Sequence, residues 1–119
     1  MDLDGAEHVS NTVEVRYGSA ARFRIDQNFP NPFIATEGGA TKIRFELPED
    51  DVVSLRVYSA TGQLTRTLLD NQLMRSGDRD VPWDGIDEFG IPAASGVYQY
   101  VLESPRFGSL WNKMVLIGR

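Results

Sequence analysis

Acidic side chains gather in residues 83–90, the part of the sequence best supplied with groups that could do chemistry. Asp84, Asp87 and Glu88 lie there with glycines between and after them. Carboxylate oxygens suit Ca²⁺, which takes about six to eight hard ligands. The spacing differs from that of an EF-hand loop, and turns also use Asp and Gly to satisfy backbone groups. The three carboxylates are therefore weak calcium candidates, and we expect no bound metal.

Catalysis would need a nucleophile with its base, or a pair of carboxylates with shifted pKa values. The single histidine, His8, lies near the start of the chain, and there is no cysteine. A Ser-His-Asp triad, a cysteine nucleophile and a thiolate metal site are thereby excluded from the predicted folded part. Asp84 with Glu88 and Glu49 with Asp50 form the carboxylate pairs, but adjacent acids in turns are far more often solvated surface. We predict no enzymatic activity and no cofactor.

The overall charge argues against other classes of function. The chain has 17 acidic and 12 basic residues, a net charge of -5 and a pI near 4.7. Negative charge repels polyanions, so we expect no binding to nucleic acid. No apolar run approaches the roughly 20 residues that cross a bilayer, and the first residues are acidic where a signal peptide would be basic. We expect no membrane span and no N-terminal export signal.

Short stretches in which every second residue is apolar recur along the chain, separated by Gly, Pro and Asp. This period is typical of half-buried antiparallel strands. Seven strands are expected, at residues 21–33, 41–47, 53–58, 64–69, 77–83, 96–103 and 110–117. Residues 64–69 should return beside 53–58 as a hairpin, and 96–103, apolar on both faces, should be a central strand. Residues 12–17 alternate well enough to form one additional strand. The spacing of the turns predicts an all-β fold, an Ig-like antiparallel β-sandwich of about seven strands.

The regular pattern sets the predicted domain boundary. We interpret residues 1–18 as a linker or the tail of an upstream domain, and residues 19–119 as one Ig-like domain. Within it, Phe45 should face the core. Pro82 lacks a backbone donor, so its strand should lie at a sheet edge or end there. Tyr98 should occupy the tyrosine-corner position of such sandwiches, where a phenol bonds back to the backbone.

Four aromatic residues raise the alternative of carbohydrate binding, because exposed rings on a β-sandwich can stack on sugars. Trp83 and Tyr100 fall on predicted core faces, which leaves Tyr58 and Trp111 as exposed candidates. Single exposed aromatics are common and need no explanation. A weak glycan contact, in a carbohydrate-binding module of a multidomain extracellular protein, therefore stays open as an alternative.

Two further segments stand out by their residue types. Residues 27–33 read Gln-Asn-Phe-Pro-Asn-Pro-Phe, and the two prolines fix φ and push the residues before them away from helix. This predicts a kinked edge strand in which Phe29 and Phe33 fill the end of the sandwich. Residues 113–119 read Lys-Met-Val-Leu-Ile-Gly-Arg, the last strand of the chain. As an edge strand, it could be captured by another protein through strand addition.

Together these segments resemble the C-terminal sorting domain of proteins exported by the type IX (Por) secretion system. That domain is an Ig-like sandwich related to the flagellar hook-cap Ig domain. The resemblance also covers Thr-Lys-Ile-Arg-Phe-Glu-Leu-Pro at 41–48, Trp-Asp-Gly at 83–85 and Ser-Gly-Val-Tyr at 95–98. Residues 34–40 depart from the pattern, being longer and richer in glycine than the usual connection, as does the final Gly118-Arg119.

The resemblance implies a non-catalytic sorting signal, recognised in the periplasm by the type IX outer-membrane translocon. A sortase-like peptidase would then cleave upstream of the sandwich, and the cargo would reach the cell surface or the extracellular space. The implied recognition residues are Pro30, Asn31, Pro32, Phe33, Lys113, Met114, Val115, Leu116 and Ile117. The candidate cleavage region is Tyr17, Gly18, Ser19, Ala20 and Ala21, which is small and flexible. A structural module like the hook-cap domain is the remaining alternative.

Overall fold

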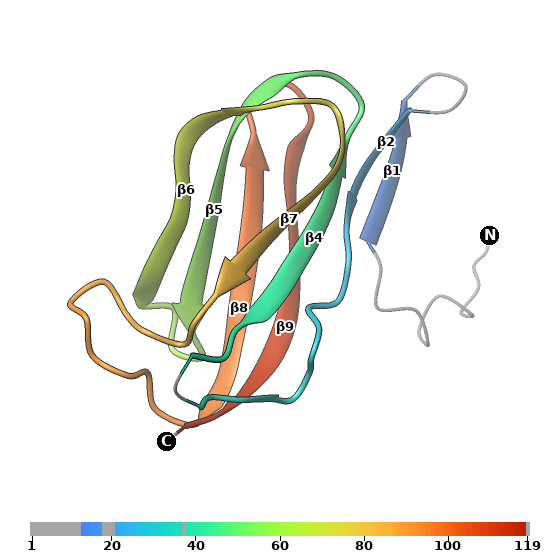
Figure 1. The fold of residues 1–119 in the computed structure, drawn as a ribbon. Coiled ribbons are helices and arrows are strands. Elements are labelled where there is room, and N and C mark those ends of the chain that lie inside the picture. The colour runs from blue at the N-terminus through green and yellow to red at the C-terminus, as the bar shows by residue number, and fades with distance from the viewer. Residues whose placement is uncertain (1–12, 18–20, 37, 119) are drawn as a thin grey trace.

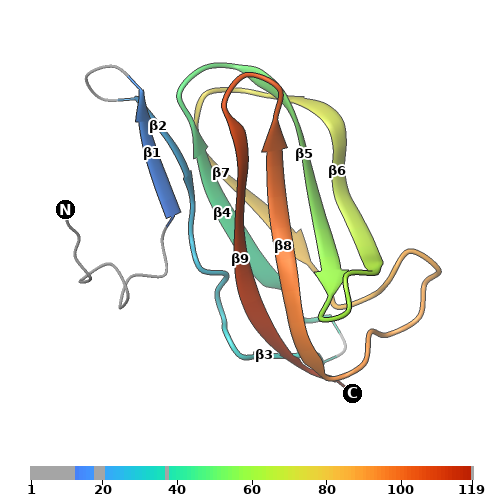
Figure 2. The same ribbon diagram turned by 180° about the vertical axis from the view of Figure 1, so that it is seen from behind.

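The computed structural model describes residues 13–17, 21–36 and 38–118, which form nine strands in two sheets packed face to face (Figures 1 and 2). One sheet has the order β1-β2-β4-β7 and the other β3-β9-β8-β5-β6. The strands are β1 Val13–Tyr17, β2 Ala21–Ile25, β3 Phe33–Ile34, β4 Thr41–Leu47, β5 Asp51–Ser59, β6 Leu64–Met74, β7 Gly77–Trp83, β8 Gly96–Ser104 and β9 Gly108–Ile117. The predicted all-β, Ig-like sandwich is confirmed. None of the residues described belongs to a helix that could span a membrane.

The four-stranded sheet follows directly from alternation in the sequence. In β4, Ile43, Phe45 and Leu47 are buried and the residues between them face outward, because successive side chains of a strand point to opposite faces. β7 pairs with β4 at one edge, as Pro82 predicted. The additional strand expected at 12–17 is β1, which pairs with β2 at the other edge.

The five-stranded sheet has β8 near its centre, between β5 and β9, as its apolar faces predicted. β5 and β6 form the expected hairpin, and Gly62 in its turn has φ +90, a conformation that favours glycine. β6 continues to Met74, beyond the predicted end at Leu69. Register shifts between β5 and β6 allow this, because an irregular ladder can continue after the simple alternation of apolar residues has ended.

The predicted single strand at residues 21–33 is wrong. β2 ends at Ile25, and the chain then crosses to the other sheet, where β3 lies parallel to β9 (Figure 2). The peptide bonds before Pro30 and Pro32 are both cis. Phe33 is buried, but Phe29 is 79% exposed and does not fill the end of the sandwich. Phe29 pairs through its backbone with Lys42, and directly paired residues share a face, which here is the outer one.

The prediction that β9 is an edge strand is also wrong. Its inner edge pairs with β8 along the whole strand, but β3 pairs with Leu116 and Ile117 on the opposite edge. The physical reason is the crossing of residues 26–32, which brings a segment from the other sheet against the last strand. β9 is thus covered where it was expected to be open.

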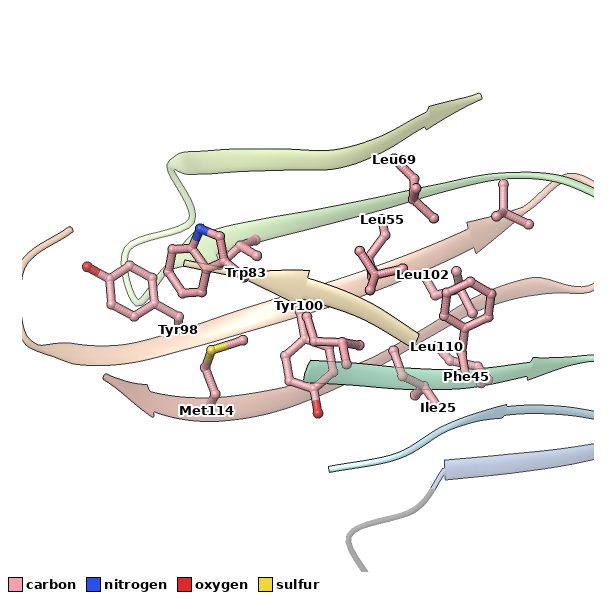
Figure 3. Close-up of a cluster of buried hydrophobic side chains, with 14 of the residues drawn as sticks. Ile25, Phe45, Leu55, Leu69, Trp83, Tyr98, Tyr100, Leu102, Leu110 and Met114 are labelled. Carbon is pink, nitrogen blue, oxygen red and sulfur yellow. The ribbon is translucent and has the colours of Figure 1, made fainter. Parts of the chain in front are cut away.

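The core lies between the two sheets and closes at the end where the chain crosses (Figure 3). Trp83 and Tyr98 meet edge to face there, with ring centroids 5.7 Å apart. Tyr100 and Met114 lie beside them on neighbouring strands of the five-stranded sheet, and both are buried. The tightly packed end of the sandwich therefore underlies the two segments that the sequence singled out.

Candidate functional site

Residues 27–33 and 113–119, the two segments on which the resemblance mainly rests, are neighbours in the structure. We call residues 26–35 the strap. Phe33 pairs with Leu116 and Ile34 with Ile117, and the amide of Ala35 donates to the carbonyl of Ile117 at 2.9 Å. Figure 2 shows β3 beside the end of β9. The strap and the end of β9 therefore form one surface.

Two side chains of the strap extend this cover along β9. Asn31 Oδ1 accepts a hydrogen bond from the amide of Val115 at 2.9 Å, and Gln27 Nε2 donates to the carbonyl of Lys113 at 2.6 Å. In a regular sheet, a neighbouring strand would make these bonds with its backbone. Here Asn31 and Gln27 make them in place of a strand.

A buried hydrogen-bond network fixes the start of the strap. Asn28 is almost fully buried, and its amide donates to the hydroxyl of Tyr100 at 2.9 Å. The same hydroxyl donates to the carbonyl of Asp26 at 2.6 Å. Asn28 Nδ2 donates to Thr41 Oγ1, which in turn donates to the carbonyl of Pro30, both at 2.9 Å. Burial raises the pKa of Tyr100 far above its ordinary value, so the hydroxyl keeps the proton that it donates.

The ring of Phe33 packs at the end of the strap, against the Trp-Asp-Gly turn at residues 83–85. A Cβ placed on Gly85 would lie 3.3 Å from Phe33 Cε2, 3.5 Å from Ala35 Cβ and 3.7 Å from Leu116 Cδ1. Gly85 also has φ +80. The Trp-Asp-Gly turn therefore needs its glycine both for its backbone conformation and for the close approach of the ring. The strap, the end of β9 and the Trp-Asp-Gly turn therefore meet around Phe33.

The predicted recognition residues divide into an exposed and a buried set. The buried set consists of Phe33, Met114 and Leu116, which belong to the core. The exposed set consists of Pro30, Asn31, Pro32, Lys113, Val115 and Ile117. Only the exposed set can contact another protein while the sandwich remains folded, and we call it the exposed sorting residues.

The tyrosine corner is present as predicted. The hydroxyl of Tyr98 donates to the carbonyl of Ala94, four residues earlier, at 2.6 Å. Burial raises the pKa of Tyr98. Close by, the amide of Gly118 donates to Ser95 Oγ at 2.7 Å, so the residue after β9 is held by the Ser-Gly-Val-Tyr segment. This end of the domain is thus fixed by local bonds as well as by the strap.

The calcium candidates accept hydrogen bonds from backbone amides of their own loop and of β6. Asp84 Oδ1 accepts from the amide of Ile86 at 3.0 Å, and Asp87 Oδ1 accepts from the amides of Phe89 and Ile91 at 2.8 and 3.0 Å. Glu88 Oε1 accepts from the amide of Thr67 at 2.6 Å. Over the described ranges, no three His, Cys, Asp or Glu residues are grouped so that they could hold a metal ion. The structure does not bring these three carboxylates together as ligands.

The two carboxylate pairs considered for catalysis lie beside arginines. Arg66 lies 3.6 Å from Asp84 and 3.9 Å from Glu88, and it also donates to the carbonyl of Ile86 at 2.9 Å. Glu49 forms an ion pair with Arg106 at 2.6 Å. Asp50 accepts from the amide of Ser76 at 2.8 Å. The Arg66 contacts join a loop to β6, and those of Glu49 and Asp50 join turns to one another, which is a structural use of the charges.

The aromatic residues lie as the sequence predicted for the core. Trp83 and Tyr100 are buried, and Trp111 is 50% exposed on β9. Tyr58 is half-buried on β5, where it pairs with Gln99 of β8. Tyr58 and Trp111 belong to the same outer face, because their partners Gln99 and Val101 are two residues apart on β8. The strand β8 lies between them, so the two rings are not direct neighbours. Trp111 is the better-exposed ring of the two.

Sequence reasoning missed the residues that hold the strap. Thr41 occupies a position of β4 that shares the core face with Ile43, so a polar residue at a core position was the available signal. Asn28 and Gln27 gave no such signal, because their partners are distant in sequence.

Among the earlier candidates, His8, Gly18, Ser19 and Ala20 lie outside the described residues. Tyr17 and Ala21 are the paired ends of β1 and β2.

Comparison with solved structures finds a protein that contains a region of similar fold. The chain is similar to part of PorZ, which is described as an essential bacterial surface component of the type-IX secretion system of the human oral bacterium Porphyromonas gingivalis. The TM-score is 0.55 and the identity 22%, over 76% of this chain and 11% of PorZ. This chain thus spans about a tenth of the length of PorZ. No curated protein matches the sequence.

The family can be assigned from the sequence itself. The FlgD Ig-like domain family matches residues 31–106, which is more than half of the chain. The match runs from the strap through the Trp-Asp-Gly turn to the end of β8, and the two-sheet architecture agrees with it. The chain therefore belongs to the FlgD Ig-like domain family.

Proposed function

We propose that this Ig-like domain is a non-catalytic sorting domain that directs an exported bacterial protein through the type IX secretion system. The observation that carries the proposal is the union of the strap with residues 113–117 in one surface. Membership of the FlgD Ig-like family and the likeness to a region of PorZ support it. The sorting domain comprises residues 19–119, and it passes through the periplasm to the cell surface or the extracellular space.

The exposed sorting residues supply the surface that the outer-membrane translocon recognises. Lys113, Val115 and Ile117 project from the outer face of β9, because alternate residues of a strand share a face. Asn31 lies against this row through its bond to Val115, and Pro30 and Pro32 flank it. A partner would therefore meet one cation and an apolar row on the outer face of the sheet, next to the exposed residues of the strap.

Cleavage by the sortase-like peptidase is proposed at residues 17–21. Tyr17 and Ala21 are paired, so this segment connects β1 to β2. A cut there would leave β1 with the cargo, and β1 would have to separate from β2 for release. Sequencing the N-terminus of the released sorting domain would test the position, and a start within β4 or beyond would contradict it.

The sorting role is tested by surface display of a reporter fused to the whole chain in a bacterium with a type IX system. Deleting residues 113–119 would remove Met114 and Leu116 from the core, so a truncation would confuse export with folding. The triple variant Lys113→Ser, Val115→Ser, Ile117→Ser alters only the exposed side chains of β9. We expect it to stay in the periplasm in folded form.

The matched control is Arg75→Ser, Val52→Ser, Leu73→Ser, which removes one exposed cation and two exposed apolar side chains far from β9. Val52 and Leu73 are paired on β5 and β6, at the opposite edge of the same sheet, and Arg75 follows β6. We expect this control to be displayed like the unaltered chain. Thermal unfolding of both variants verifies the fold, and equal display of the two would contradict the proposal.

A second candidate function is glycan binding, and the exposure of Trp111 is the observation that favours it. Trp83 is buried, so sugar-dependent quenching of tryptophan fluorescence would report Trp111. A panel of polysaccharides tested on the chain and on Trp111→Ala distinguishes the two functions. Quenching that disappears in Trp111→Ala would favour a carbohydrate-binding module, and the absence of quenching would remove it.

A further inference from the structure

The two edges of β9 are bound in different ways. Along its inner edge, β9 pairs with β8 from Gly108 to Leu116 in an unbroken antiparallel register. Along its outer edge, β3 pairs only with Leu116 and Ile117, and the side chains of Gln27 and Asn31 bind two further backbone groups. An edge covered by side chains and a two-residue strand is far less extensively paired than one in a full ladder.

The part of the strap after Pro30 has few attachments to the rest of the domain other than those to β9. Asn31, Pro32 and Ile34 are exposed. Phe33 is the large side chain that this part buries. The part up to Pro30 is held separately, by the bonds of Asn28 and Pro30 to Tyr100 and Thr41 and by the backbone pair of Phe29 with Lys42. Residues 31–35 can therefore leave β9 by turning after Pro30 while the buried network stays intact.

Departure of residues 31–35 would uncover a defined acceptor for an extended peptide. The backbone groups of Val115 and Ile117 that now bind these residues would be unpaired. Beside them would lie the space occupied by the Phe33 ring, lined by Gly85 and Leu116. A strand with one large apolar side chain at the correct position satisfies both, since added strands bind through their backbone and are selected by side-chain pockets.

We propose that the end of the strap, residues 31–35, is a displaceable strand. An extended segment of the export machinery, carrying a large apolar side chain, adds to the outer edge of β9. Its backbone replaces the bonds made by Asn31 and by residues 33–35, and its apolar side chain takes the place of the Phe33 ring. This inference rests on the proposed sorting function and names the mode of recognition at the same site.

The proposal is tested by a disulfide that fixes the strap to β9. Ile34 and Ile117 are direct neighbours in the parallel register, and both are exposed. Neighbouring strands lie about 5 Å apart, which suits a disulfide. The chain has no cysteine, so Ile34→Cys with Ile117→Cys can form only this bridge within it. Each single cysteine variant is the matched control for the loss of its isoleucine.

Display of a reporter fused to the whole chain is then compared among the unaltered chain, the two single variants and the oxidised double variant. We expect display of the oxidised double variant to fall by about tenfold or more, because the competent open state is removed, and a reductant to restore it to the level of the single variants. Display of the oxidised double variant equal to that of the single variants would overturn the displaceable strand while leaving the sorting function standing. Failure of the unaltered fusion to be displayed would overturn the sorting function, and with it this inference.

A binding measurement on purified protein tests the chemistry of the added strand. Phe33→Ala leaves the pocket vacant, and a synthetic peptide with the sequence of residues 28–36 supplies the missing ring. We expect this peptide to raise the melting temperature of Phe33→Ala, and the same peptide with alanine at the position of Phe33 to leave it unchanged. No difference between the two peptides, or an equal rise for the oxidised double variant, would overturn the role of the apolar side chain.

Discussion

The strap and the loop at residues 84–91 are both irregular segments rich in turn-forming residues, but they are held by different kinds of contact. In the loop, Asp84 and Asp87 bind backbone amides two to four residues away. In the strap, Gln27, Asn28 and Asn31 bind groups 72 to 86 residues away in the sequence. The turns of the loop are formed by its own residues, and Glu88 attaches the loop to the neighbouring β6, whereas the strap is held by groups of both sheets.

This difference has consequences for how each segment responds to change. A local bond forms as soon as its short turn forms, but a bond over some 80 residues requires the intervening chain to be folded. The strap should therefore follow the stability of β9 and of the core, and the loop should not. Their phenylalanines show the contrast directly, since Phe33 is 2% exposed and Phe89 is 87% exposed.

The largest expected effect compares these two rings. Phe33→Ala should lower the free energy of unfolding by about 3–5 kcal/mol, because it removes a buried ring and leaves a cavity. Phe45→Ala, in the centre of β4, should cost a similar amount of about 3–5 kcal/mol. Phe89→Ala should change it by less than about 0.5 kcal/mol. Denaturant unfolding measures all three, and similar losses for Phe33 and Phe89 would break the comparison.

A smaller effect separates the two tyrosines of β8. Tyr100→Phe removes a hydroxyl that serves both Asp26 and Asn28, and it leaves these backbone groups unpaired in the interior. We expect a loss of about 1–3 kcal/mol. Tyr98→Phe removes one bond to a carbonyl four residues away and should cost about 0.5–1.5 kcal/mol. The order of the two losses in chemical denaturation is the test, and a greater loss for Tyr98 would show that local bonds dominate.

The same tyrosines predict how stability depends on alkaline pH. Burial raises the pKa of Tyr100, so the unfolded chain loses this proton near pH 10 while the folded chain keeps it. The stabilisation is fully present below about pH 10 and is lost as the pH rises, by up to about 1.4 kcal/mol per pH unit. The unaltered chain should therefore lose stability between about pH 9 and 11 more steeply than Tyr100→Phe. Parallel curves would contradict this.

The smallest expected effect concerns the exposed bond between Asn31 and β9. Asn31→Ala should lower the free energy of unfolding by about 0.5–1 kcal/mol, since the bond is exposed to water. Its local effect should be larger, because the amide of Val115 loses its acceptor and should exchange its hydrogen faster. Gln72→Ala, at an exposed position of β6, is the control for an exposed polar side chain. Unchanged exchange at Val115 would show that Asn31 does not protect the edge.

Much of the fold could be predicted from local patterns. The alternation in β4, the bounds of β7, the central place of β8 and the tyrosine corner at Tyr98 all depend on residues close in sequence. The use of Asp84 and Asp87 in turns has the same origin. Local period and turn chemistry fix which residues face inward, because they depend on the pleat and on short-range bonds.

The strap could not be predicted in this way. The sequence indicated that residues 27–33 and 113–117 were special, but not that they pair with each other or that β9 would be covered. A side chain such as that of Gln27 or Asn31 can bind any nearby backbone group, so its partner is chosen only when the sheets assemble. The sequence by itself therefore determined most of the strands, their inward faces and the local turns. The tertiary structure alone decided which edge the strap covers, because that choice depends on contacts between distant segments that no local pattern records.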